Sequence, residues 1–63
     1  MERLKDARIK AGVTQHEIAE ALNINRTTYN KYENGASKPT PETLSRIGDY
    51  FHVSVDYLTY PTT

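Results

Sequence analysis

Apolar residues recur at spacings of three and four along this chain, and signals for helix ends interrupt them at several places. The first such segment contains Leu4, Ala7 and Ala11 and predicts a helix over about residues 2–11. Gly12 follows directly and favours the left-handed conformation in which many helices end. The pattern therefore predicts an amphipathic helix at the start of the chain.

A second helix begins with a capping motif. Glu17 follows Thr14 by three residues, so the hydroxyl can accept a hydrogen bond from one free backbone N–H while the carboxylate reaches back to another. The apolar positions that follow are Ile18, Ala19 and Leu22. We expect this helix to run from Thr14 to about Leu22, with those three residues facing inward.

A tight turn joins this helix to a third. Asn23 tolerates the left-handed conformation and Asn25 is a good N-cap, so only about three residues separate the two helices. Asn34 and Gly35 form a strong signal for a helix C-terminus. The third helix is therefore expected over residues 25–34, and the pair is arranged as a helix-turn-helix.

Two further helices complete the pattern. Thr40 and Pro41 supply an N-cap and a first helical position for a fourth helix that extends to about His52. Ser54 then caps a short fifth helix. The apolar positions of these two helices are Leu44, Ile47, Phe51, Val55 and Leu58. The chain as a whole predicts a compact all-α fold of five helices.

The size and composition narrow the class of protein. The chain has 63 residues and no cysteine, so one domain over residues 1–63 must be stabilised by packed apolar faces alone. Such a domain has little room for a deep enzyme cleft, and no nucleophile, acid/base pair or phosphate loop is evident. No apolar run approaches the ~20 residues that cross a membrane. We expect a cytoplasmic binding domain without enzymatic activity and without a cofactor.

The charge distribution matters more than the net charge, which is zero. A neutral chain is a mild argument against nucleic-acid binding, because phosphate affinity comes from clustered Lys and Arg. However, residues 1–38 contain seven basic and five acidic side chains, whereas residues 39–63 contain one basic and three acidic. The positive excess therefore lies in the part of the chain that contains the helix-turn-helix.

The third helix has two distinct faces when successive residues are placed ~100° apart. Tyr29, Tyr32 and Glu33 fall on the arc that docks onto the domain. The other arc carries a guanidinium, a hydroxyl, a carboxamide and an ammonium group, from Arg26, Thr27, Asn30 and Lys31. Arg or Lys suits guanine and Asn suits adenine in the major groove. This face therefore favours a reader of base edges over an ordinary solvated helix surface.

A set of residues in this order and spacing resembles the Cro/CI-type, or XRE, helix-turn-helix family. The run comprises Thr14-Gln15, Ile18-Ala19, Leu22, Ile24, Tyr32-Glu33-Asn34-Gly35, Pro39, Leu44 and Val53-Ser54-Val55-Asp56-Tyr57-Leu58. The resemblance covers almost the whole chain. It implies a five-helix, lambda-repressor-like domain that binds a double-stranded, palindromic DNA operator, usually as a homodimer, to regulate transcription, most often by repression.

The resemblance also implies roles for individual residues. Arg26, Thr27 and Lys31 would read bases, with Asn30 a further candidate. The residues that would hold phosphates, or brace those that do, are Gln15, Asn25, Thr28, Asn34 and Lys38. The family tends to pair an arginine of the first helix with the glutamate of the third, which here means Arg8 and Glu33. Asn23 stands where the family usually has glycine, and the family varies at Arg26, so the operator sequence stays open.

Other residues carry weaker expectations. His16 and His52 lack a carboxylate or cysteine at ligand spacing, so we expect no metal site. Tyr57 and Tyr60 lie near the C-terminus, where we expect a weak homodimer contact.

The alternative function is a protein-interaction module, such as an antitoxin or the partner of another regulator, because the same fold serves both. The neutral net charge favours it, and the polar face of the third helix opposes it.

Overall fold

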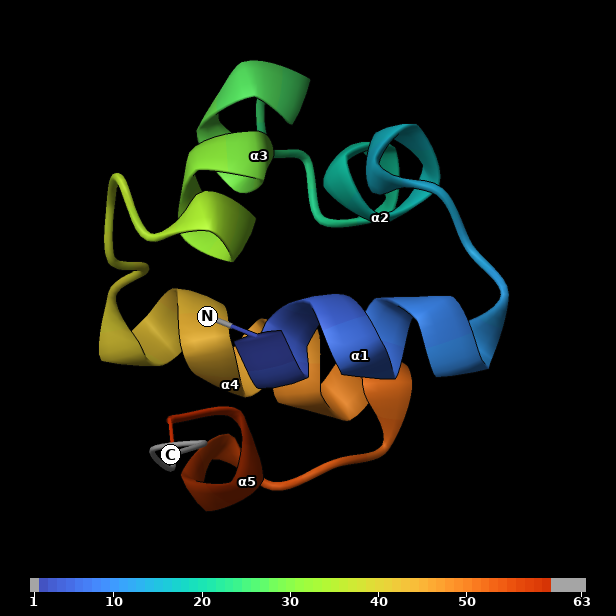
Figure 1. Ribbon diagram of the computed structural model, residues 1–63, viewed down its shortest axis with the longest axis vertical. Coiled ribbons are helices and arrows are strands. Elements are labelled where there is room, and N and C mark those ends of the chain that lie inside the picture. The colour runs from blue at the N-terminus through green and yellow to red at the C-terminus, as the bar shows by residue number, and fades with distance from the viewer. Residues whose placement is uncertain (1, 60–63) are drawn as a thin grey trace.

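Five helices and their connections form the part of the chain that this computed structural model describes, residues 2–59. The helices are α1 (Glu2–Ala11), α2 (Gln15–Ala21), α3 (Arg26–Asn34), α4 (Pro41–Phe51) and α5 (Val55–Thr59). No strand occurs within those residues. Figure 1 shows α2 and α3 together on one side of the domain, with α1, α4 and α5 on the other. The all-α, five-helix fold expected from the sequence is confirmed.

The expected caps define the helix-turn-helix. The Thr14 hydroxyl accepts from the Glu17 backbone N–H at 3.1 Å, and the Glu17 carboxylate accepts from the Thr14 N–H at 2.9 Å. The Asn25 side-chain oxygen accepts from the Thr27 N–H at 2.8 Å at the start of α3. Asn23 lies between them with a left-handed φ of 56°. Local sequence therefore sets the length of both helices and of the turn that joins them.

The fourth helix begins and ends close to the predicted residues, but the residue at its left-handed end is a histidine. The Thr40 hydroxyl accepts from the Thr43 N–H at 3.2 Å, with Pro41 in the first turn. His52 ends the helix in the left-handed region, with φ 59° and ψ 41°. Asn and Gly, which the sequence analysis used as markers of left-handed ends, therefore do not account for every one.

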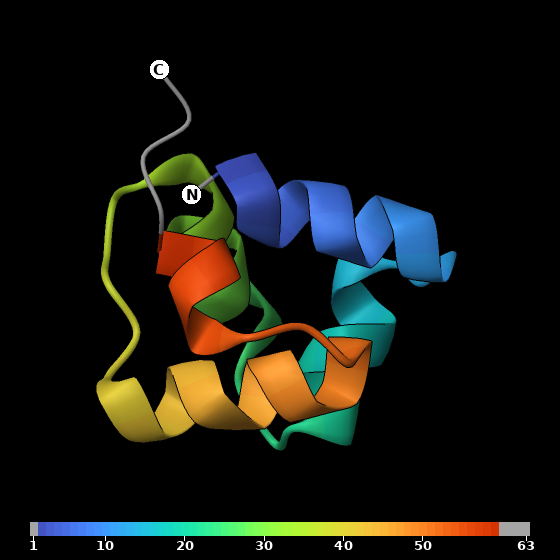
Figure 2. The same cartoon turned by 90° about the horizontal axis from the view of Figure 1, so that it is seen from below.

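The core lies where the five helices meet. Its buried side chains are Leu4, Ala7, Ile18, Ala19, Leu22, Tyr29, Leu44, Ile47, Phe51 and Leu58. The helix α1 packs against α3, α4 and α5, which makes it the central support of the fold. Figure 2 shows its C-terminal turn projecting past the other helices, which explains why Ala11, expected on the inward stripe, is exposed. None of the helices in residues 2–59 is long and apolar enough to cross a membrane.

Candidate nucleic-acid interface

The helix α3 is held against the domain by its aromatic side. Tyr29 is completely buried, and its ring meets that of Tyr32 edge-on, with centroids 6.4 Å apart and planes at 75°. Burial, and then the neighbouring Glu33 carboxylate, raise the pKa of the Tyr29 hydroxyl, which stays neutral. This anchoring fixes which face of α3 is turned to solvent.

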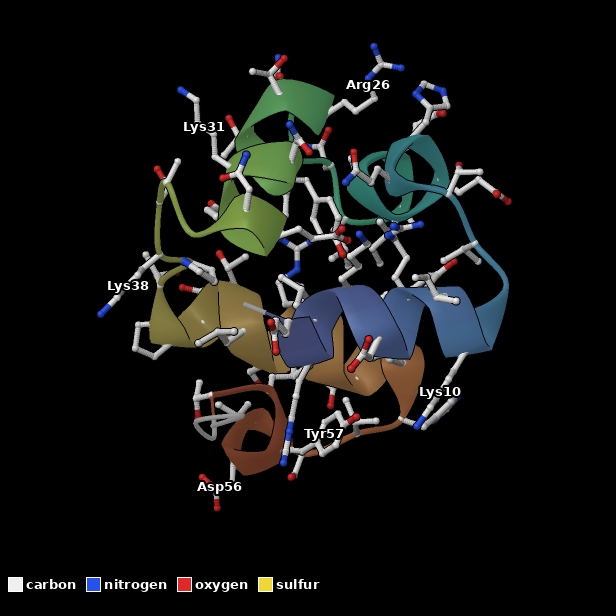
Figure 3. All side chains as sticks on the ribbon, viewed as in Figure 1. Lys10, Arg26, Lys31, Lys38, Asp56 and Tyr57 are labelled. Carbon is white, nitrogen blue, oxygen red and sulfur yellow. The ribbon has the colours of Figure 1, made fainter. Side chains whose placement is uncertain are left out.

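The opposite side of α3 carries the four residues expected to read bases. Arg26, Thr27, Asn30 and Lys31 are all exposed. Figure 3 shows Arg26 and Lys31 projecting from α3 away from the rest of the domain, with Lys38 extending from the loop that follows. Among residues 2–59 the charged ends of Arg26, Lys31 and Lys38 make no hydrogen bond or ion pair. Their cationic groups are therefore available to a ligand.

The structure brings together Arg8 and Glu33, the pair implied by the family resemblance. Arg8 Nε lies 2.6 Å from Glu33 Oε2, and the two side chains are only 14% and 3% exposed. A second guanidinium nitrogen of Arg8 donates to the Val13 carbonyl at 3.0 Å. The pair therefore ties α1 both to α3 and to the segment that leads into α2.

The Glu33 carboxylate is ionised despite its burial. Burial opposes ionisation, but hydrogen bonds from Arg8 and Gln15, the neighbouring Tyr29 hydroxyl and the positive charge of Arg8 together outweigh it. The pKa of Glu33 is therefore held below its ordinary value, and the carboxylate acts purely as a hydrogen-bond acceptor.

Gln15 connects this buried pair to the exposed face. Its Nε2 donates to Glu33 Oε1 at 3.0 Å and to Asn30 Oδ1 at 3.1 Å. Gln15, at the start of α2, is among the residues expected to hold a phosphate or to brace one that does. The structure shows its amide nitrogen already engaged by two residues of α3.

The other expected phosphate residues lie in different settings. The side-chain oxygen of Asn25 caps α3, and that of Asn34 accepts from the Ala36 N–H at 3.0 Å. Both asparagines therefore shape the ends of α3. Thr28 is half-buried, whereas Lys38 is exposed on the adjoining loop. Of this group, Lys38 is the one with a charged side chain, and among residues 2–59 its charged end makes no hydrogen bond or ion pair.

Lys5 belongs to this region although the sequence analysis counted it only as a basic residue. It lines a shallow, open pocket of about 160 Å³ between α1, α2 and α3, together with Gln15, Asn30, Glu33 and Asn34. Lys5 precedes Arg8 by three residues, so both lie on one face of α1. That spacing, combined with the expected contact between Arg8 and α3, would have placed Lys5 here.

Arg46 is a second residue that the sequence analysis missed. A guanidinium nitrogen of Arg46 donates to the Leu22 carbonyl at 2.7 Å, across from α4 to the end of α2. The contact satisfies a carbonyl at a helix C-terminus. Nothing local to Arg46 marks it, because its partner is 24 residues away.

The remaining candidates lie apart from α3. Tyr57 is half-buried, with the Arg3 guanidinium 4.8 Å from the centre of its ring. Tyr60 lies outside the described residues. His16 does have a carboxylate at close range, contrary to expectation, because Glu20 one turn later on α2 lies 2.8 Å from its Nε2. Even so, residues 2–59 contain no group of three or more side chains that could hold a metal ion.

Comparison with known proteins adds independent information. A helix-turn-helix family matches residues 4–58. The chain is 46% identical over 56 residues to the HTH-type transcriptional regulator ImmR of Bacillus subtilis. The matched segment covers 89% of this chain and 44% of ImmR. It is 40% identical over 57 residues to the cryptic phage CTXphi transcriptional repressor RstR of Vibrio cholerae. This match covers 90% of the present chain and 51% of RstR.

The chain spans about half the length of these curated relatives. The match nevertheless includes nearly all of the residues that form the five helices. This chain therefore belongs to the Cro/CI-type, or XRE, helix-turn-helix family and has its lambda-repressor-like fold.

Proposed function

We propose that this chain is the sequence-specific, double-stranded DNA-binding domain of a transcriptional regulator, with α3 as its recognition helix. The observation that carries the proposal is the composition of the exposed face of α3. Its exposed residues are Arg26, Thr27, Asn30, Lys31 and Asn34. The acidic residue of the helix, Glu33, is turned inward, and its negative charge is paired with the positive charge of Arg8. Every side chain that α3 offers to solvent is therefore basic or neutral and polar.

The dimensions and chemistry of this face suit the major groove. A helix with its side chains is ~10–12 Å wide and the groove is ~12 Å wide, so α3 fits it lengthwise. Arg26 and Lys31 would donate to guanine O6 and N7, and Thr27 would contact a neighbouring base. Lys38, at the edge of the same surface, would neutralise a phosphate and contribute affinity without base preference.

Transcriptional control by a homodimer completes the proposal. ImmR and RstR are named as a transcriptional regulator and a transcriptional repressor. By this likeness the domain would act in the cytoplasm, on chromosomal or phage DNA, and without catalysis. One recognition helix contacts few bases, so two copies on a palindromic operator would supply the specificity that regulation requires.

Selection of bound duplexes from a random DNA library tests the proposal. We expect enrichment of a palindrome that binds at least ~10³-fold more tightly than a scrambled duplex at the same salt concentration. Failure to enrich any sequence, with only weak salt-sensitive binding, would contradict the proposal and favour a protein partner.

A pair of lysine variants identifies the face that meets DNA. Lys38→Ala should weaken binding to all sequences alike and reduce the salt dependence by about one counterion. Lys10→Ala removes the same charge from the far end of α1, on the other side of the domain in Figure 3, and should leave binding unchanged. Equal losses for the two variants would show that charge alone, without a defined face, governs binding.

A further inference from the structure

A continuous chain of hydrogen bonds leads from the buried ion pair to the exposed face of α3. Arg8 donates to Glu33, Gln15 donates to Glu33 at 3.0 Å, and the same Gln15 nitrogen donates to Asn30 Oδ1 at 3.1 Å. Gln15 and Asn30 line the open pocket beside α3, and Asn30 is exposed. Asn30, the last residue in this series of hydrogen bonds, is therefore accessible to a ligand that approaches α3.

The orientation of the Gln15 amide is set by Glu33, and the orientation of the Asn30 amide is set by Gln15. An ionised carboxylate only accepts hydrogen bonds, so Gln15 must turn Nε2, and not its oxygen, to Glu33. That nitrogen has two hydrogens, and the second is directed to Asn30, which must accept it through its side-chain oxygen. Because the amide is planar, Asn30 Nδ2 is then directed away from Gln15.

We propose that Glu33, acting through Gln15, holds the carboxamide of Asn30 in one orientation, so that Asn30 presents a hydrogen-bond donor to a base edge. Gln15 and Glu33 are positioning residues in this scheme, and Asn30 touches the DNA. The proposal deepens the proposed function and rests on it, since it concerns what α3 reads.

The orientation changes the expected base preference. A carboxamide that is free to turn suits adenine, where the oxygen accepts from N6 and the nitrogen donates to N7. A fixed donor suits acceptors, which guanine offers at O6 and N7, adenine at N7 and thymine at O4. Cytosine offers only its N4 donor in the major groove. Asn30 should therefore select against cytosine on the strand that it contacts.

Selection with Asn30→Ala identifies the base pair concerned, as the position where the preference of the wild type disappears. At that position the wild type should bind guanine, adenine or thymine about tenfold more tightly than cytosine. A preference for cytosine there, or no altered position, would overturn the inference while leaving the proposed function intact. Failure of the wild type to select any site would overturn both.

Asn30→Asp reverses the polarity of the outward atom. The oxygen that accepts from Gln15 is kept and the donor becomes an acceptor, so the preference at this base pair should move to cytosine. Asn34→Asp is the matched control, because it adds the same charge to the exposed side of the same helix while keeping its oxygen for the Ala36 N–H. The control should weaken binding to all sequences without altering this preference, and an equal change in both variants would contradict the inference.

Gln15→Met tests the positioning role directly. Methionine has nearly the same size and helix propensity but cannot donate, so the Asn30 amide is released. The discrimination against cytosine should fall from about tenfold to about twofold, because the freed amide can turn its oxygen to the N4 donor of cytosine. A merely structural role for Gln15 would lower the melting temperature and leave this ratio unchanged.

Discussion

The Glu33 carboxylate, paired with Arg8 of α1 and bonded to Gln15 of α2, joins three helices at one buried point. Glu33 is the buried acidic side chain of the described chain, and its carboxylate is matched by hydrogen bonds from two other helices. Breaking such a pair by removing one partner leaves a buried charge without compensation, which is strongly destabilising. The same carboxylate sets the orientation of Gln15, so its effect extends to the exposed face.

Removal of the Glu33 charge should lower stability and flatten its pH dependence. The pKa of Glu33 in the folded protein is below its ordinary value of 4.5, so its contribution is complete above that value and is lost as the pH falls below it. Glu33→Gln should therefore reduce the free energy of unfolding by about 3 kcal/mol at pH 7, and by progressively less in acid.

Thermal unfolding followed by circular dichroism over a series of pH values measures this difference. Glu20→Gln is the control, because that carboxylate is 73% exposed and should change the stability by less than about 0.5 kcal/mol. Parallel pH profiles for the wild type and Glu33→Gln would show that Glu33 is not the titrating group.

Residues differ in how far the sequence predicts their surroundings. The caps at Thr14 and Asn25 depend on backbone groups two or three residues away, so the spacing alone is sufficient. The orientation of Gln15 depends on a carboxylate 18 residues away and on that carboxylate's own partner in α1. Such a chain of partners follows from the tertiary arrangement, and no local pattern encodes it.

At the scale of the elements, local signals were sufficient for the helix boundaries because capping is a local event. The left-handed conformation of His52 is an exception, because no glycine or asparagine marks it, and it arises in the connection between α4 and α5. There the Val53 N–H donates to the Gly48 carbonyl at 2.9 Å, which closes the end of α4 and turns the chain. Gly48 lies inside α4, where glycine is usually unfavourable, so its presence needs a tertiary explanation.

Close approach of the chain to α4 supplies that explanation. A Cβ at position 48 would lie 2.7 Å from the Val53 carbonyl oxygen, which is a backbone atom held in place by the turn. Gly48→Ala should therefore lower the free energy of unfolding by about 1–3 kcal/mol through overpacking, even though alanine favours a helix.

Urea denaturation measures this effect, with Ser45→Ala as the control at an exposed position of the same helix. The control should change the stability by no more than about 0.5 kcal/mol. A Gly48→Ala variant as stable as the wild type would mean that the connection moves aside freely.

At the scale of the whole molecule, zero net charge conceals an uneven surface. Arg26, Lys31 and Lys38 extend from α3 and its loop, whereas Asp56 lies at the opposite end of the domain in Figure 3. The three cations around α3 would favour an approach with α3 towards DNA.

Binding of two copies to one operator is a prediction at this scale. Light scattering of the domain with a selected full-site duplex should give two chains per duplex, with half-site centres about one DNA turn, ~34–36 Å, apart. A complex with one chain per full site would contradict the homodimer. Tyr57 is the described residue we expect at the contact, so Tyr57→Ser should reduce cooperativity more than affinity for an isolated half-site.

The most direct test of the central claim, that α3 reads bases, is the effect of Arg26→Ala on two DNA duplexes. Affinities for the selected operator and for scrambled DNA would be measured at one salt concentration. We expect a loss of about 1–3 kcal/mol on the operator and a much smaller loss on scrambled DNA. Equal losses on both duplexes would show that Arg26 contacts only the phosphate backbone and would contradict the claim.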